Sequence, residues 1–171
     1  EITYGDWSSD VCSSDLQPPP TPPGQPQPAA IRHPARPQEL VLGQSLPLSG
    51  PSARLGLEYR QGALAWFNEL NRRGGIHGRP IRLVSLDDRY EPALTLRNTE
   101  RLIHHDRAFA LFGYVGTPTV KAVLPLLTQQ HIPLVAPLTG AGLLRQPAQT
   151  QVINLRTSYQ VEIDRIVDRK S

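Results

Sequence analysis

From Glu39 onward, short apolar runs alternate with longer segments in which apolar residues recur every three or four positions. The apolar runs predict buried strands over residues 39–46, 79–86, 109–113, 131–137 and 152–155. The periodic segments predict amphipathic helices over residues 53–73, 92–105, 117–130 and 160–167. Because strands and helices alternate, we predict an α/β fold in which an open parallel sheet carries helices on both faces.

The first 38 residues follow a different pattern, because half of the 18 prolines lie between Pro18 and Pro37. Proline fixes the backbone φ angle and removes a hydrogen-bond donor, which favours extended conformations without a packed core. We therefore expect residues 17–38 to be a disordered linker. Residues 39–167 are expected to form a single folded domain.

The segment DWSSDVCSSDL, residues 6–16, holds the single cysteine and one of the two tryptophans. A catalytic nucleophile, a metal ligand, half of a disulfide and an acidic docking peptide are all conceivable roles for it. It resembles, however, the translation of a sequencing-library adapter, and residues 168–171 resemble the translated start of the complementary adapter strand. We therefore expect residues 1–16 and 168–171 to be non-native, so that Cys12 says nothing about the redox compartment. The absence of methionine, even at position 1, favours a processed or truncated chain.

The charge pattern argues against two classes of partner. The net charge of +3 comes almost entirely from arginine, and the longest basic cluster is Arg72-Arg73. Nucleic-acid binding of the polybasic type is therefore not expected. The chain also lacks an apolar stretch of about 18 residues, so no membrane-spanning helix is predicted.

In an open parallel sheet, ligands bind beyond the carboxyl ends of the strands. Three of the loops predicted there place a glycine beside a hydroxyl, namely Ser49, Thr117 or Thr139. Thr117 is predicted at the start of a helix, where free N–H groups and the helix dipole favour a small carboxylate. The alternative is that Thr117 only caps that helix.

The remaining polar motifs do not favour enzymatic chemistry. Asp87-Asp88 would suit a metal or phosphoryl site, but no lysine follows the fourth or fifth predicted strand, so we interpret the pair as a polar turn. The adjacent His104-His105 cannot both face one ligand on a helix. Because no phosphate-binding glycine loop or nucleophile–base–acid set is present, we expect neither an enzyme nor a bound metal or cofactor.

Several motifs together are typical of one family: PLSG after the first strand, the turn NRRGGIHGRPI, the Asp87-Asp88 pair, and GYVGTPT followed by PLVAP. On these motifs, residues 39–167 resemble the amino-terminal lobe of branched-chain-amino-acid-type substrate-binding proteins of ABC transporters. The resemblance implies a type I periplasmic-binding fold, in which two hinged lobes trap a small ligand and hand it to a membrane permease. It implies a periplasmic or extracytoplasmic location, and the proline-rich segment suits a lipid-anchored protein.

The resemblance also implies roles for individual residues. Thr117, with Gly116 beside it, would hold the carboxylate of an amino acid. The loop containing Leu138, Thr139 and Gly140 would supply a carbonyl for the ammonium group and a hydroxyl, although relatives often carry that hydroxyl one or two positions after Thr139. Acidic and aromatic ligand contacts usually come from the second lobe. The full predicted ligand-binding set is Ser49, Leu55, Gly116, Thr117, Leu138, Thr139 and Gly140, in which Leu55 would close over the ligand at a position that is often aromatic in relatives.

A second function is compatible with this fold, because ligand-sensing domains of signal-transduction receptors have it too. A stop codon after the second lobe would favour transport, whereas a membrane span followed by a kinase or cyclase module would favour sensing. With either function, one lobe cannot enclose a ligand, so we expect this chain alone to bind no amino acid tightly.

Overall fold

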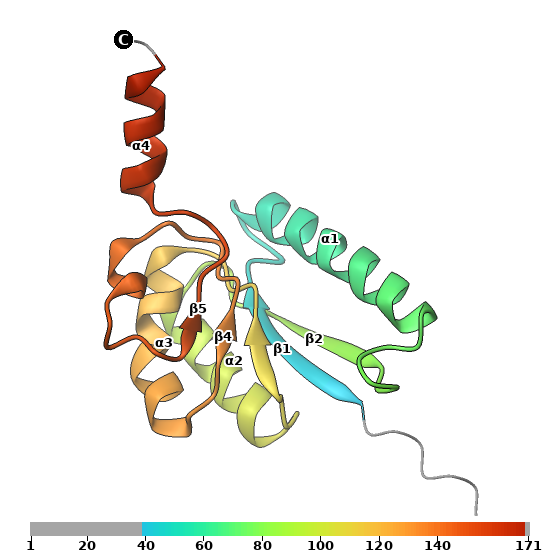
Figure 1. Cartoon of the computed structure of the whole chain (residues 1–171). Coiled ribbons are helices and arrows are strands. Elements are labelled where there is room, and N and C mark those ends of the chain that lie inside the picture. Colours follow the sequence, from blue (N-terminus) through green and yellow to red (C-terminus); the bar gives the residue numbers. More distant parts are fainter. Residues whose placement is uncertain (1–38, 170–171) are drawn as a thin grey trace, which may run out of the picture. The chain divides into compact units, whose positions relative to one another are not determined.

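The structure, a computed structural model, describes residues 39–169 (Figure 1). The proline-rich segment and residues 1–16 lie outside the described residues, as do Lys170 and Ser171. The elements in chain order are β1 (Leu40–Leu46), α1 (Ala53–Arg72), β2 (Ile81–Asp87), α2 (Pro92–His104), β3 (Ala110–Phe112), α3 (Thr117–Gln130), β4 (Leu134–Val135), the 3-10 helix η1 (Gly142–Arg145), β5 (Val152–Ile153) and α4 (Tyr159–Asp168).

The described strands form one parallel sheet in the order β2-β1-β3-β4-β5. The chain moves outward from β1 to β2 and then crosses back to β3, so right-handed crossovers place α1 and α2 on opposite faces. Figure 1 shows this arrangement, with α2 and α3 side by side behind the sheet and α1 on the other face. The predicted α/β fold with helices on both faces is confirmed.

The main core lies between the sheet and the α2–α3 pair. Both helices, β3 and β4 contribute fully buried side chains to it, among them Leu102, Leu111, Val120, Leu127 and Leu134. Gly43 of β1 faces this core, where a Cβ atom would lie 3.0 Å from Leu111 and 3.1 Å from Leu102. The absence of a side chain at Gly43 therefore lets α2 approach β1 closely.

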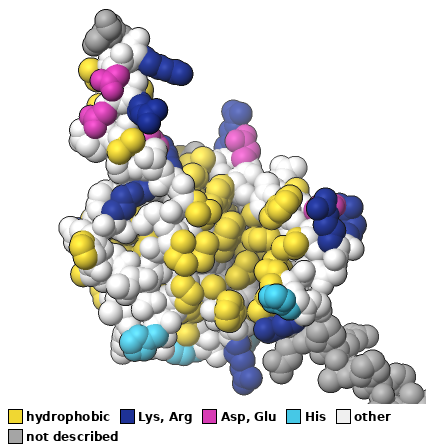
Figure 2. All heavy atoms as spheres, in the orientation of Figure 1, with side chains coloured by type: hydrophobic (Ala, Val, Ile, Leu, Met, Phe, Trp, Pro, Cys, Tyr) yellow, Lys and Arg dark blue, Asp and Glu magenta, His cyan; other side chains and the backbone are white. Residues whose placement is uncertain are grey.

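The opposite face is only partly covered. Phe112 of β3 packs against α1, stacking on Tyr59 with ring centroids 6.2 Å apart and meeting Phe67 edge-on at 5.3 Å. Farther along this face, Ile153 of β5 is 50% exposed. Figure 2 shows the resulting concentration of apolar side chains on this side. A contiguous apolar surface of this kind is unusual on an isolated soluble domain.

The strands near the end of the chain are shorter than the sequence predicts. The run 131–137 contributes only Leu134–Val135, because His131 and Ala136 adopt left-handed conformations with φ of 51° and 54°. The run 152–155 likewise contributes only Val152–Ile153, and η1 was not predicted. Pro125 lies within α3, and the helix continues past it to Gln130.

The last described helix, α4, has no buried residue. Its apolar side chains Val161, Ile163, Ile166 and Val167 are all about half exposed. None of the helices within residues 39–169 is long and apolar enough to cross a membrane.

Candidate ligand-binding site

The loop after β1 is fixed to the end of β2 by Asp87. One carboxylate oxygen accepts hydrogen bonds from the backbone N–H groups of Leu48, at 2.8 Å, and Ser49, at 3.3 Å. The other oxygen accepts from the Ser49 hydroxyl at 2.5 Å. Desolvation raises the pKa of Asp87, but the hydrogen bonds from the Ser49 hydroxyl and from backbone N–H groups outweigh it and lower the pKa overall. The Ser49 hydroxyl therefore stabilises the conformation of the loop after β1 by donating to Asp87.

Asp88 points into the protein on the other side of the sheet. It is fully buried and accepts hydrogen bonds from the Ser45 hydroxyl at 2.9 Å, the Thr95 hydroxyl at 3.1 Å and the Tyr90 N–H at 2.9 Å. Burial raises the pKa of this carboxyl group. The two aspartates thus form a polar turn, as the sequence suggested. Within residues 39–169, no three His, Cys, Asp or Glu side chains are placed to hold a metal ion.

Replacing Asp87 with alanine should lower the free energy of unfolding by about 1–3 kcal/mol at pH 7, because the Leu48 and Ser49 donors lose their acceptor. The folded-state pKa of Asp87 lies below its ordinary value of 3.8, so this stabilisation is present above that pH and is lost as the pH falls through the folded pKa. Urea unfolding at pH 7 and pH 3 measures the effect. The exposed Asp164→Ala variant is the control, and an equal Asp87→Ala effect at both pH values would refute the assignment.

The loops after β3 and β4 meet at the carboxyl edge of the sheet. Val115 and Leu138 form a parallel bridge, in which the Leu138 N–H donates to the Tyr114 carbonyl at 2.7 Å and the Leu138 carbonyl accepts from Gly116 at 3.4 Å. Beside this bridge, the hydroxyl oxygens of Thr117 and Thr139 lie 2.7 Å apart. Two hydroxyls that are 22 residues apart in the chain are thereby placed at one point.

The amino terminus of α3 opens onto this pair of hydroxyls. The N-cap is Gly116, with φ of 99°, and no side chain caps the helix. Thr119 bonds back to the Val115 carbonyl at 2.6 Å, whereas Thr117 turns to Thr139. The alternative in which Thr117 only caps α3 is therefore wrong. The first N–H groups of α3 and the positive end of its dipole remain suited to an anion.

The hydrogen bonds of Thr139 determine what Thr117 can offer. Thr139 is fully buried and accepts from the Ala141 N–H at 3.2 Å, and its hydroxyl oxygen lies 3.3 Å from the Tyr159 hydroxyl. A threonine hydroxyl has one proton and two acceptor positions. When Tyr159 donates to Thr139 and Thr139 donates to Thr117, the proton of the part-exposed Thr117 is left to donate to a carboxylate.

The other predicted residues divide into two groups. Gly116, Leu138 and Gly140 lie with the threonine pair, and the Gly140 carbonyl accepts from the Tyr159 N–H at 2.9 Å. Leu55 lies in the first turns of α1, is 49% exposed, and lines an open depression of about 390 Å³ with Pro51, Ser52, Arg54 and Glu58. Among the described residues, no hydrogen bond joins Ser49 to Thr117 or Thr139.

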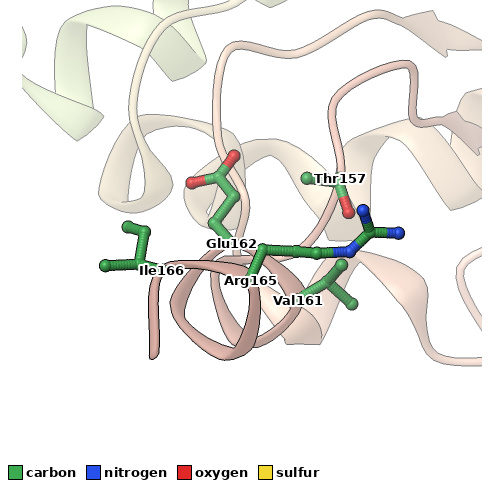
Figure 3. A pocket seen from close by; sticks show the side chains of 5 residues that line it. All are labelled: Thr157, Val161, Glu162, Arg165 and Ile166. Carbon is green, nitrogen blue, oxygen red and sulfur yellow. The ribbon is translucent and has the colours of Figure 1, made fainter. Parts of the chain in front are cut away.

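A second depression, of about 550 Å³, lies along α4 and contains none of the predicted ligand-binding residues (Figure 3). It is lined by Thr157, Val161, Glu162, Arg165 and Ile166. The carboxylate in this lining, that of Glu162, is bonded to Arg156 at 2.8 and 2.9 Å. The carboxyl edge of the sheet, which holds the threonine pair, is therefore the candidate ligand site.

Sequence reasoning did not identify two tyrosines at this edge. The ring of Tyr90 lies against Gly116, and the ring of Tyr159 lies against Gly140. The sequence contains one hint of these rings, because Gly116 precedes Thr117 and Gly140 follows Thr139. A glycine leaves room for a neighbouring ring.

Known proteins share this lobe. The family model described as "Periplasmic binding protein" matches residues 39–170. A possible leucine/isoleucine/valine-binding protein from Rhodopirellula baltica is 39% identical, with a TM-score of 0.74 over 80% of this chain and 37% of its own. The branched-chain amino acid transporter substrate binding protein LivJ from Streptococcus pneumoniae, in complex with isoleucine, is 25% identical, with a TM-score of 0.64 over 70% of this chain and 34% of its own.

A solute binding protein of an ABC transporter from R. palustris, in complex with benzoate, is 27% identical, with a TM-score of 0.62 over 70% of this chain and 33% of its own. The chain spans between 23% and 37% of the length of these and other similar binding proteins. These relatives are described as binding proteins, which agrees at family level with the expectation of a non-enzymatic function. The match of the family model over most of the chain shows that this chain belongs to the periplasmic binding protein family.

Proposed function

We propose that residues 39–167 are the amino-terminal ligand-binding lobe of an extracytoplasmic solute-binding component of an ABC transporter. The ligand is a branched-chain or other amino acid, or a similar small carboxylate. A membrane permease is the partner that receives it. The proline-rich residues 17–38 would tether the lobe, and residues 1–16 and 168–171 would be non-native.

The observation that carries this proposal is the placement of the Thr117 and Thr139 hydroxyls, 2.7 Å apart, at the uncapped amino terminus of α3. A hydroxyl donor, free backbone N–H groups and a helix dipole act together on a single negative charge. Isoleucine and benzoate, which are bound in two of the related structures, both carry a carboxylate.

The position of this edge in the molecule fits a two-lobed receptor. The threonine pair lies at the carboxyl ends of parallel strands, where ligands of open α/β sheets bind. One lobe contacts only one side of a ligand there, and a second lobe closing over it would exclude water and supply the remaining contacts. The bound, closed form would then be the one that the permease recognises.

The test uses the complete protein, meaning the product of the uninterrupted gene that contains residues 39–167. Isothermal titration against the common amino acids and small carboxylates should give micromolar or tighter binding for at least one of them, whereas residues 39–167 alone should not. The matched control ligand is the amine that lacks only the carboxylate, such as 2-methylbutylamine for L-isoleucine. It should not bind. Equal binding of the two would contradict a carboxylate site.

A further inference from the structure

Tyr90 is held in an unusual backbone conformation. Arg89 and Tyr90 both lie in the left-handed region, with φ of 52° and 65°. Asp87 accepts the Arg89 N–H at 3.0 Å and Asp88 accepts the Tyr90 N–H at 2.9 Å, so the two carboxyl groups stabilise this turn. Left-handed residues other than glycine are uncommon and are concentrated at ligand-binding and active sites.

The effect of this turn is to place the Tyr90 ring on the amino terminus of α3. A Cβ atom at Gly116 would lie 2.4 Å from Cε2 of Tyr90 and 2.6 Å from its hydroxyl oxygen. Gly116 is the N-cap of α3 and precedes Thr117. The phenol ring therefore borders the position that we assign to the ligand carboxylate, and Tyr90 remains 37% exposed there.

Tyr159 lies near the same position, beside the loop that follows β4. Its N–H donates to the Gly140 carbonyl at 2.9 Å, and a Cβ atom at Gly140 would lie 2.5 Å from the Tyr159 ring. Its hydroxyl lies 3.3 Å from that of Thr139, a contact that lowers the pKa of Tyr159. The ring is also in cation–π contact with Arg156 at 5.2 Å and is 42% exposed.

The two rings lie on the two glycines that adjoin the Thr117–Thr139 pair in the sequence. A partly exposed phenol ring offers an apolar face of large area at low entropic cost, together with one polar edge. Rings that border a carboxylate position contact the group attached to that carboxylate. Neither ring has a role in the sheet core, whose cluster of buried side chains includes neither Tyr90 nor Tyr159.

We infer that Tyr90 and Tyr159 form two aromatic walls of the ligand pocket and select carboxylates that carry an apolar substituent over those with little or none. This inference rests on the proposed function and extends it from the charged end of the ligand to the remainder. It assigns aromatic contacts to this lobe, in addition to those that the resemblance places in the second lobe.

The experiment compares matched ligands that differ only in the apolar substituent. The probes are L-isoleucine against L-alanine, and benzoate against acetate, titrated into the complete protein. Tyr90→Ala should weaken binding of the larger probe by about 5- to 30-fold and change binding of the smaller one by less than about 2-fold. Tyr159→Ala should show the same difference when it is compared with Tyr159→Phe, because both variants lack the hydroxyl that contacts Thr139 and differ only in the ring. Tyr90→Phe and Tyr159→Phe, which keep the ring, should restore the preference for the larger probe.

Phe109→Ala is the matched control, because it removes a 66% exposed aromatic ring next to the opposite end of β3. It should leave both affinities unchanged. Equal losses for the large and small probes in the alanine variants, or no loss for either, would overturn the aromatic walls and leave the proposed function intact. Failure of the unmodified complete protein to prefer the larger probe of either pair would also overturn the aromatic walls, whereas failure to bind any common amino acid or small carboxylate would overturn both proposals.

Discussion

Replacing Thr117 with valine in the complete protein should weaken ligand binding by about 10- to 100-fold, because a hydrogen bond to a charged group contributes about 1.5–3 kcal/mol. Valine keeps the shape of threonine and removes only the hydroxyl group. The Thr117 hydroxyl is the part-exposed member of the pair with Thr139, so it is the one that can reach a carboxylate. Isothermal titration with the tightest-binding amino acid or carboxylate measures the loss.

Thr128→Val is the matched control for this variant. Thr128 belongs to the same helix and is exposed, and its hydroxyl donates to the Leu124 carbonyl of that helix at 3.2 Å. Its substitution should leave binding unchanged, and both variants should keep their thermal unfolding midpoints within a few degrees. If Thr117→Val binds as tightly as the unmodified protein, the carboxylate is not held at Thr117.

The second large effect concerns the packing of α1. Gly56 is buried against the loop after β1, and a Cβ atom there would lie 1.8 Å from the Pro47 carbonyl oxygen. Because a backbone atom cannot rotate away as a flexible side chain does, Gly56→Ala must shift α1 or the PLSG loop. We expect a loss of about 3 kcal/mol in the free energy of unfolding, at the upper end of typical overpacking effects. For a domain of this size the midpoint should fall by about 10 °C.

Gly62 provides the comparison within the same helix. A Cβ atom at Gly62 meets nothing within 4 Å, and the residue is exposed. Gly62→Ala should therefore stabilise the lobe by about 0.5–1 kcal/mol through helix propensity alone. In thermal and urea unfolding, we expect Gly56→Ala to lower the free energy of unfolding and Gly62→Ala to raise it. A Gly56→Ala variant as stable as Gly62→Ala would show that α1 does not pack as described.

The hydrophobic pattern was enough to predict most of the fold. Helices such as α2 and α3 begin where predicted, because a proline in the first turn and a clear apolar stripe mark them. The lengths of β4 and β5 could not be predicted in this way. Ala136 adopts a left-handed conformation that alanine rarely prefers, so its surroundings in the folded lobe impose it. The residues around Ala136 in the sequence give no indication of this left-handed conformation.

The candidate site was predictable to a similar degree. The rule that loops meet at the carboxyl edge of a parallel sheet was sufficient to bring Thr117 and Thr139 together. The direction of the Ser49 hydroxyl depends on Asp87, 38 residues away, and the positions of Tyr90 and Tyr159 depend on contacts with distant glycines. Side-chain orientations of this kind follow from tertiary packing, which spacing along the chain does not reveal.

A crystal structure of the complete protein with its tightest-binding amino acid or carboxylate tests the central claim most directly. The account predicts that the ligand carboxylate lies within hydrogen-bond distance of the Thr117 hydroxyl and of the N–H groups that begin α3, with Thr139 beside it. A ligand bound elsewhere, such as in the depression along α4, or one whose carboxylate points away from α3, would contradict it.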